Sequence, residues 1–155
     1  MLTHHRKSVL LSLISCDLPL SSLVKTTGTL EQKDNERFNL LLTQSLVPEQ
    51  LTRVTTAKDP CLLWLEISPY RVTMTMQAIA QLNYRHFWEP GVYGNSRYWL
   101  NSQSLQNNNQ LHLRNFTRRL TLVGRPLPQQ LRVEYELWSD KVQMGNYILN
   151  VEIQH

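Results

Sequence analysis

The segments LRVEYELW (Leu131–Trp138) and YILNVEI (Tyr147–Ile153) decide how this sequence is interpreted as a fold. In both segments an apolar side chain occupies every second position, with charged or polar side chains at most of the positions between. Strict alternation of this kind indicates a β-strand with one buried face. The connection between the segments contains Gly145-Asn146, a turn signal. The sequence therefore predicts that the chain ends in an antiparallel pair of strands.

Strand patterns continue back toward the N-terminus as far as about residue 61. The compact apolar run Leu62–Ile67 is typical of a buried strand. The segment Tyr70–Ala80 alternates, although a helix over Met74–Leu82 competes with that interpretation. Arg97–Leu100 is a further short strand candidate. Together with the C-terminal pair, these segments predict an extended antiparallel sheet.

One predicted strand, Leu111–Val123, changes its parity midway. Leu113 and Leu120 would point to opposite faces of a regular strand, because their positions differ by an odd number. A β-bulge near Asn115 would return the later apolar residues to the face of the earlier ones. We therefore expect an irregularity in this strand.

The N-terminal third is interpreted as helical. A short helix is expected over Lys7–Ile14, and a second over Leu20–Lys25 that ends at Gly28. A longer helix is expected to begin after Thr29, as its N-cap, and to run to about Leu46. The predicted fold is α+β and a single domain over residues 1–155, mainly helical over 1–50 and mainly strand over 61–155. Its N-terminal helices would pack on one face of a five- to six-stranded, mainly antiparallel sheet.

The composition of the 155-residue chain limits which cellular compartment and which kinds of cofactor or metal chemistry are expected. Two cysteines, Cys16 and Cys61, lie outside any CxxC pair, which favours reduced thiols in a cytoplasmic protein. The alternative is a lipoprotein modified at Cys16, because Leu13-Ile14-Ser15-Cys16 resembles a lipoprotein signal box. No apolar run is long enough for a membrane-spanning helix. Nucleotide-binding and metal-binding motifs are absent, so neither a cofactor nor a metal is expected.

The distribution of arginines and aromatic residues is the strongest functional signal. Residues 90–133 contain six arginines and no Asp or Glu, and the overlapping segment 84–99 holds six of the thirteen aromatic residues. The net charge of +4 is modest, so this asymmetry matters more than the total. A surface of this composition favours an anionic or π-rich partner.

One pair of residues is a candidate for catalysis. His86 titrates near neutral pH, and Glu89 is close enough in sequence to orient it. On an extended strand, however, residues three apart point to opposite faces, so the pair would have to meet in a turn. The competing interpretation is that His86 is a solvated neighbour of core aromatics.

The leading hypothesis is a small non-enzymatic binding or assembly protein that docks a protein partner. Its binding residues would come from the aromatic and arginine-rich region: Trp88, Arg97, Tyr98, Trp99, His112, Arg114, Arg119 and Arg132. Glu134 and Glu136 share a face with the last of these and would partly neutralise it.

Two alternatives remain open. The first is a small-molecule-binding or enzymatic domain with a pocket between helices and sheet, lined by Tyr70, Met74, Trp88, Tyr98, His86 and Arg97. The second is nucleic-acid binding through the basic segment 97–132. The sequence does not determine the oligomeric state.

Overall fold

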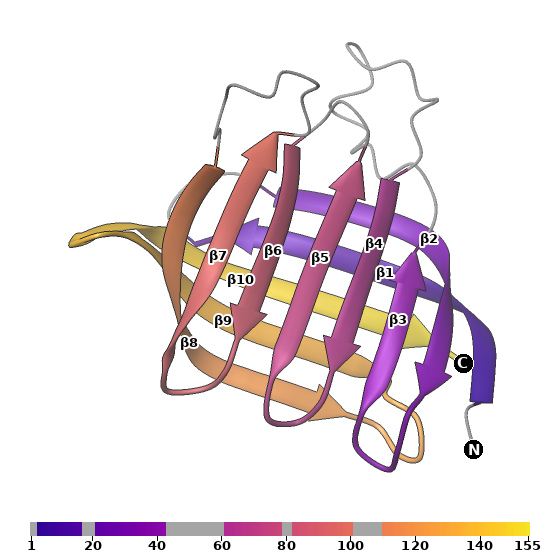
Figure 1. The fold of residues 1–155 in the computed structure, drawn as a ribbon. Coiled ribbons are helices and arrows are strands. Elements are labelled where there is room, and N and C mark those ends of the chain that lie inside the picture. Colours follow the sequence, from indigo (N-terminus) through magenta and orange to yellow (C-terminus); the bar gives the residue numbers. More distant parts are fainter. Residues whose placement is uncertain (1–2, 17–20, 43–60, 79–81, 101–109) are drawn as a thin grey trace.

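The computed structural model describes residues 3–16, 21–42, 61–78, 82–100 and 110–155. Over these ranges the chain forms ten β-strands and no helix (Figure 1). The strands are β1 (Thr3–Ser15), β2 (Ser21–Gln32), β3 (Phe38–Leu42), β4 (Cys61–Ile67), β5 (Val72–Ala78), β6 (Leu82–Trp88), β7 (Tyr93–Leu100), β8 (Gln110–Val123), β9 (Gln130–Ser139) and β10 (Val142–Gln154).

The ten strands close into one antiparallel barrel. Each strand pairs with the next along the chain, and β1 pairs with β10 to close the circle. In Figure 1 β4 to β7 stand side by side in front, while β1, β9 and β10 cross behind them at an angle. The barrel therefore has two walls whose strands cross at an angle and face each other across the interior.

The closed barrel corrects the prediction of an α+β fold. All three expected N-terminal helices are wrong where the structure describes them, because residues 3–15, 21–32 and 38–42 are strands. The predicted helix over Lys7–Ile14 is wrong because apolar residues occupy both faces of β1, so the alternation typical of a strand is not visible there. Gly28 does not end a helix but lies within β2, where an added Cβ would overlap the side chain of Leu42.

The segment expected to be a long helix from Thr29 to Leu46 turns back at its polar centre. The carboxylate of Asp34 accepts hydrogen bonds from the backbone N–H groups of Glu36 and Arg37, each at 2.9 Å. A side chain that bonds its own following backbone in this way stabilises a turn in place of a helix. Residues 43–46 of the predicted helix lie outside the described residues.

The predicted strands from Cys61 onward agree better with the structure. Leu62–Ile67 corresponds to β4, and the competing helix at Met74–Leu82 is wrong over residues 74–78, which belong to β5. The bulge expected near Asn115 occurs slightly later, as a register shift between Thr117 and Arg119. The expected turn at Gly145-Asn146 is wrong in position, because the β9–β10 hairpin turns at Asp140-Lys141 and Gly145 lies at a second register shift.

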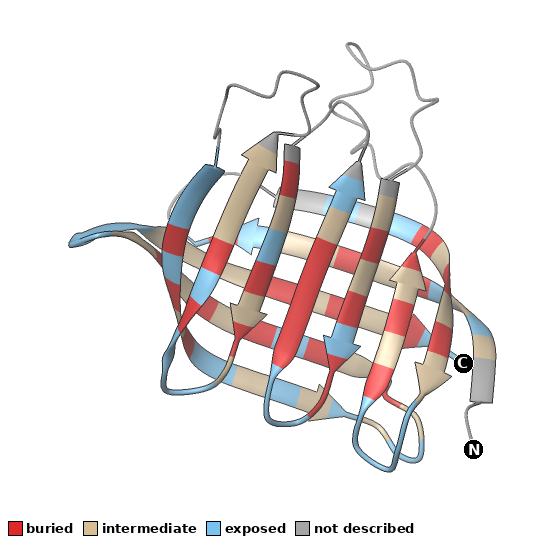
Figure 2. Cartoon of the chain, viewed as in Figure 1, coloured by how far each residue is buried: buried red, intermediate tan, exposed pale blue. Residues whose placement is uncertain are grey.

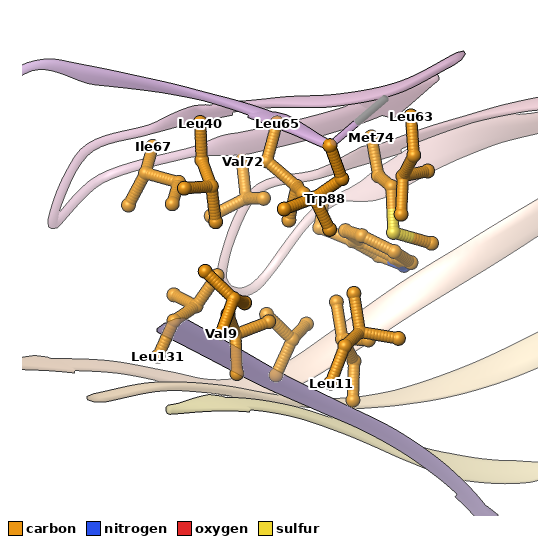
Figure 3. Close-up of a cluster of buried hydrophobic side chains, with 14 of the residues drawn as sticks. Val9, Leu11, Leu40, Leu63, Leu65, Ile67, Val72, Met74, Trp88 and Leu131 are labelled. Carbon is orange, nitrogen blue, oxygen red and sulfur yellow. The ribbon is translucent and has the colours of Figure 1, made fainter. Parts of the chain in front are cut away.

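The hydrophobic core fills the inside of the barrel. Buried and more exposed residues alternate along most strands, as Figure 2 shows. In Figure 3 the side chains of Leu40, Leu65 and Val72 face those of Val9 and Leu131 across the interior. Trp88 is fully buried among them.

A polar and aromatic cluster inside the barrel

A second part of the interior differs from the aliphatic core because it is polar and aromatic. Strands β6, β7 and β8 point His86, Ser96, Asn115 and Thr117 inward, and all four are buried. We call these four residues, together with Trp88 and Tyr98, the interior polar cluster. Alternation explains the placement, since Tyr84, His86 and Trp88 occupy every second position of β6.

A chain of hydrogen bonds connects the centre of the cluster. Asn115 Nδ2 donates to Ser96 Oγ at 2.8 Å, and Ser96 Oγ lies 2.8 Å from His86 Nδ1. On the other side of the ring, His86 Nε2 lies 3.4 Å from the hydroxyl of Tyr98. If the imidazole proton is on Nε2, the Ser96 hydroxyl donates to Nδ1 and the imidazole N–H donates to the Tyr98 oxygen. The Nδ1 tautomer is equally compatible, with Nδ1–H donating to Ser96 Oγ and the Tyr98 hydroxyl donating to Nε2, so both contacts form whichever nitrogen carries the proton.

Aromatic rings enclose His86. The indole of Trp88 is stacked on the imidazole, with ring centroids 4.9 Å apart and planes 7° apart. Tyr135 reaches across from β9 and contacts both rings, at 6.0 Å from His86 and 4.9 Å from Trp88. Met74 pairs directly with His86 from β5. These neighbours leave His86 almost without exposed surface.

Burial determines the charge of the titratable groups His86, Tyr98 and Tyr135. It lowers the pKa of His86 to about 3, so the imidazole is neutral at physiological pH. It also raises the pKa of Tyr98 to about 12, with a further contribution from Tyr147. The pKa of Tyr135 is raised well above its usual value for the same reason, and neighbouring tyrosines add to the effect. The cluster is therefore uncharged and provides hydrogen-bonding groups only.

Three buried polar atoms of the cluster have no hydrogen-bond partner among the described residues: Trp88 Nε1, Asn115 Oδ1 and Thr117 Oγ1. Such groups are costly, at about 1–3 kcal/mol each. Gly94 lies opposite Asn115 and lets the Asn115 amide approach closely, since a Cβ there would lie 3.0 Å from Asn115 Oδ1 and overlap the carbonyl oxygen of Phe87. A donor, an acceptor and a hydroxyl of the cluster thus lie unsatisfied inside the barrel.

The interior is more exposed near the end of the barrel where β5 ends and β6 begins. There the inward-facing side chains of Leu13, Met76, Tyr84, Tyr98 and Tyr147 are only partly buried, although they pack against the core. Toward the opposite end, Leu30, Leu40 and Val72 have no exposed surface, whereas the inward-facing Leu120 and Leu122 of β8 are partly buried. The tyrosines form a rim above the polar cluster.

The expected binding residues are divided between the two faces of the barrel wall. Trp88 and Tyr98 point inward, so Trp88 cannot anchor a partner on the surface. Of the expected pocket lining, Met74 and His86 are also inside, whereas Tyr70 and Arg97 are not. The remaining expected residues alternate with inward-facing ones and lie on the outer face: Arg97, Trp99, His112, Arg114, Arg119 and Arg132.

The expected pairing of His86 with Glu89 is not formed. His86 is inside the barrel, whereas Glu89 follows β6 and lies 3.9 Å from the guanidinium of Arg71 on the outside. Sequence reasoning also missed Ser96, Asn115 and Thr117. Their signal is positional, because Ser96 shares a face of its strand with Tyr98, and Asn115 and Thr117 share a face with Leu113.

One surface depression is a weaker candidate for a site than the cluster. A depression of about 660 Å³ lies between the β2–β3 and β4–β5 hairpins. Its charged lining is mixed in sign, and the ion pair between Arg37 and Asp34 is already formed there. Within the described residues, no group of three His, Cys, Asp or Glu side chains is placed to hold a metal ion.

These features define the class of the molecule, an up-and-down antiparallel β-barrel with a polar aromatic interior. The fold is similar to the crystal structure of ywiB protein from Bacillus subtilis, with a TM-score of 0.60 over 99% of this chain and 94% of that chain. The sequence identity is 12%, so the similarity concerns the fold alone. No family model and no curated protein matches the sequence. No helix capable of crossing a membrane occurs in the described ranges.

Proposed function

We propose that the protein binds a small, neutral, ring-containing molecule inside the barrel, at the interior polar cluster. The observation that carries the proposal is the set of three unsatisfied buried atoms, on Trp88, Asn115 and Thr117. A ligand that carries a hydrogen-bond acceptor and a donor offers partners for the indole N–H of Trp88 and the amide oxygen of Asn115. The surrounding rings would contact its apolar body.

The partly exposed rim supports this location. Ligand sites in barrels lie in the interior and are reached from one end. Here the inward-facing Tyr84, Tyr98 and Tyr147 keep exposed surface at the end of the barrel nearest the cluster. The hydroxyl of Tyr98 remains protonated, as does that of Tyr135 below it, which suits recognition of an uncharged molecule.

A binding function fits the cluster better than catalysis. A His86 with a pKa of about 3 is too weak a base to accept a proton from Ser96 at neutral pH. No described carboxylate orients the imidazole, since Glu89 is outside. The hydrogen-bonded chain of Asn115, Ser96 and His86 therefore positions these side chains and does not transfer protons.

The proposal includes a cytoplasmic location. Lipoprotein processing would cleave before Cys16 and remove β1, the strand that joins β2 to β10. The thiol of Cys16 is free and exposed, as suits a reducing compartment.

The first test uses benzamide, a neutral ring with one amide donor and acceptor. We expect benzamide to shift the indole N–H resonance of Trp88 in a ¹⁵N–¹H spectrum and to leave that of Trp99 unchanged, because Trp99 lies on the outer face. Benzoate is the matched control, with the same ring but a charge that the neutral cluster does not compensate. If benzoate produced the same shifts, or benzamide none at Trp88, the proposed site would be wrong.

A second test separates ligand binding from structure through Thr117→Val, which replaces the hydroxyl with a methyl group of similar size. We expect the variant to bind benzamide more weakly, because the second N–H of the benzamide amide group loses the Thr117 oxygen as an acceptor. We also expect it to raise the free energy of unfolding of the free protein by about 1 kcal/mol, because an unsatisfied buried hydroxyl is removed. Chemical denaturation measures this second effect. A destabilised variant would indicate that the hydroxyl already has a structural partner.

A further inference from the structure

The outer face of β6, β7 and β8 carries a row of cationic side chains, independent of the interior cluster. Arg85 on β6 pairs directly with Arg97 on β7, and Arg97 pairs directly with His112 on β8. Arg114 follows two residues along β8, on the same face. We call Arg85, Arg97 and Arg114 the outer arginine row.

No ion pair compensates this row within the described part of the chain. The neighbouring arginines of β8 and β9 differ from this row because they form ion pairs. Arg118 pairs with Glu136 at 3.6 Å, and Arg119 pairs with Glu134 at 3.6 Å. Arg132 also contacts Glu134, at 3.4 Å. The basic segment predicted from the sequence thus divides into a neutralised part and an uncompensated part. Like charges directly opposite each other destabilise a sheet, so the row is a cost that an anion would relieve.

Aromatic rings accompany the arginines. The guanidinium of Arg97 lies 5.3 Å from the ring centroid of Trp99, and that of Arg114 lies 5.4 Å from the centroid of Tyr93. Tyr93 is 56% exposed and packs beside Phe116, with ring centroids 5.0 Å apart. The face therefore offers planar groups, both guanidinium and aromatic, next to its positive charges.

We propose that this outer face binds single-stranded nucleic acid, with phosphates at the outer arginine row and bases stacked beside Trp99 and Tyr93. Arginine rows combined with stacking rings are the means by which proteins hold single strands with little sequence preference. A nucleic acid carries a negative charge at every nucleotide whatever its sequence, which matches cations repeated on adjacent strands. An acidic peptide would need a carboxylate at each corresponding position.

The test measures fluorescence anisotropy of a labelled oligothymidylate of about twelve nucleotides, a length within the usual range for such sites. The variant is Arg85→Ala/Arg97→Ala/Arg114→Ala. For single strands, each phosphate that a protein neutralises adds about 0.7 to the steepness with which log affinity falls against log salt concentration. We expect the triple variant to reduce this steepness by about 2 and to bind at least tenfold more weakly at low salt.

The matched control is Arg118→Ala/Arg119→Ala/Arg132→Ala, which removes the same charge from arginines that are already paired. It should retain most of the affinity. Equal weakening in both variants would mean that only net charge matters and would overturn the site. A labelled oligoglutamate probes the other source of negative charge. If it bound as tightly as the oligonucleotide and depended on the same three arginines, an acidic protein would be the partner and the proposal would fail, as it would if the oligonucleotide did not bind.

Discussion

Replacing Trp88 with alanine is expected to lower the free energy of unfolding by about 3–5 kcal/mol, the usual cost of removing a large buried aromatic side chain. Trp88 has no exposed surface and stacks on His86 at 4.9 Å and against Tyr135 at 4.9 Å. Its removal reduces apolar burial and leaves a cavity between the two walls of the barrel (Figure 3). Chemical denaturation followed by circular dichroism measures the effect.

The matched control for this change is Trp99→Ala. Trp99 lies on the outer face, is only partly buried and contacts Arg97 at 5.3 Å. An exposed cation–π contact contributes about 0.5–1 kcal/mol, so the destabilisation should be several times smaller than at Trp88. Equal destabilisation by the two variants would contradict the assignment of Trp88 to the interior. This pair also tests why Trp88 cannot act as a surface anchor.

The second large effect is a dependence of stability on pH that His86 causes. Because burial lowers the pKa of His86 to about 3, the folded protein keeps the imidazole neutral where the unfolded chain protonates it, below the ordinary histidine pKa of 6.5. The unfolded state then binds more protons, so stability falls as the pH falls from 6.5 toward 3. Between about pH 7 and about pH 5 the free energy of unfolding should fall by about 2 kcal/mol.

The variant His86→Gln isolates this contribution, because glutamine does not titrate. We expect the variant to be less stable than the native protein at neutral pH, since the hydrogen bond to Ser96 is disturbed, but to lose less stability on acidification. Carboxylates such as Asp34, whose pKa is lowered chiefly by the backbone N–H of Glu36, contribute equally to both proteins and cancel. Parallel pH profiles for the two proteins would show that protons reach His86 in the folded state.

The sequence predicted the C-terminal half far better than the N-terminal third, for a physical reason. In β9 and β10 inward-facing and outward-facing positions alternate regularly over most of their length, so the period of two is visible. In β1 the outward-facing Leu10 and Ile14 are also apolar, and a short apolar run does not distinguish strand from helix. The partner strands that stabilise β1 come from β2 and from the far end of the chain, which local patterns do not reveal.

The candidate site was only partly predictable for a related reason. Trp88, Tyr98 and His86 were selected for their chemistry, and the structure places them together. The sequence analysis expects Trp88 and Tyr98 at a docking surface, whereas the structure points both into the barrel, because they alternate with outward-facing residues of β6 and β7. For the arginines, the sequence does not show which of them form ion pairs. Arg119 pairs with Glu134, whereas Arg97 has no ion pair among the described residues. Only the register between neighbouring strands distinguishes the two.

The pairing of β1 with β10 has a consequence for the nascent chain during translation. One edge of β1 is covered by β2 soon after synthesis, but the other has no partner until β10, Val142–Gln154, has emerged. During that interval the nascent chain presents an apolar strand edge, the feature that promotes association between chains. Closing the circle also joins residues separated by almost the whole length of the chain, which slows the final step. The growing polypeptide therefore exposes this edge of β1 until β10 has been synthesised.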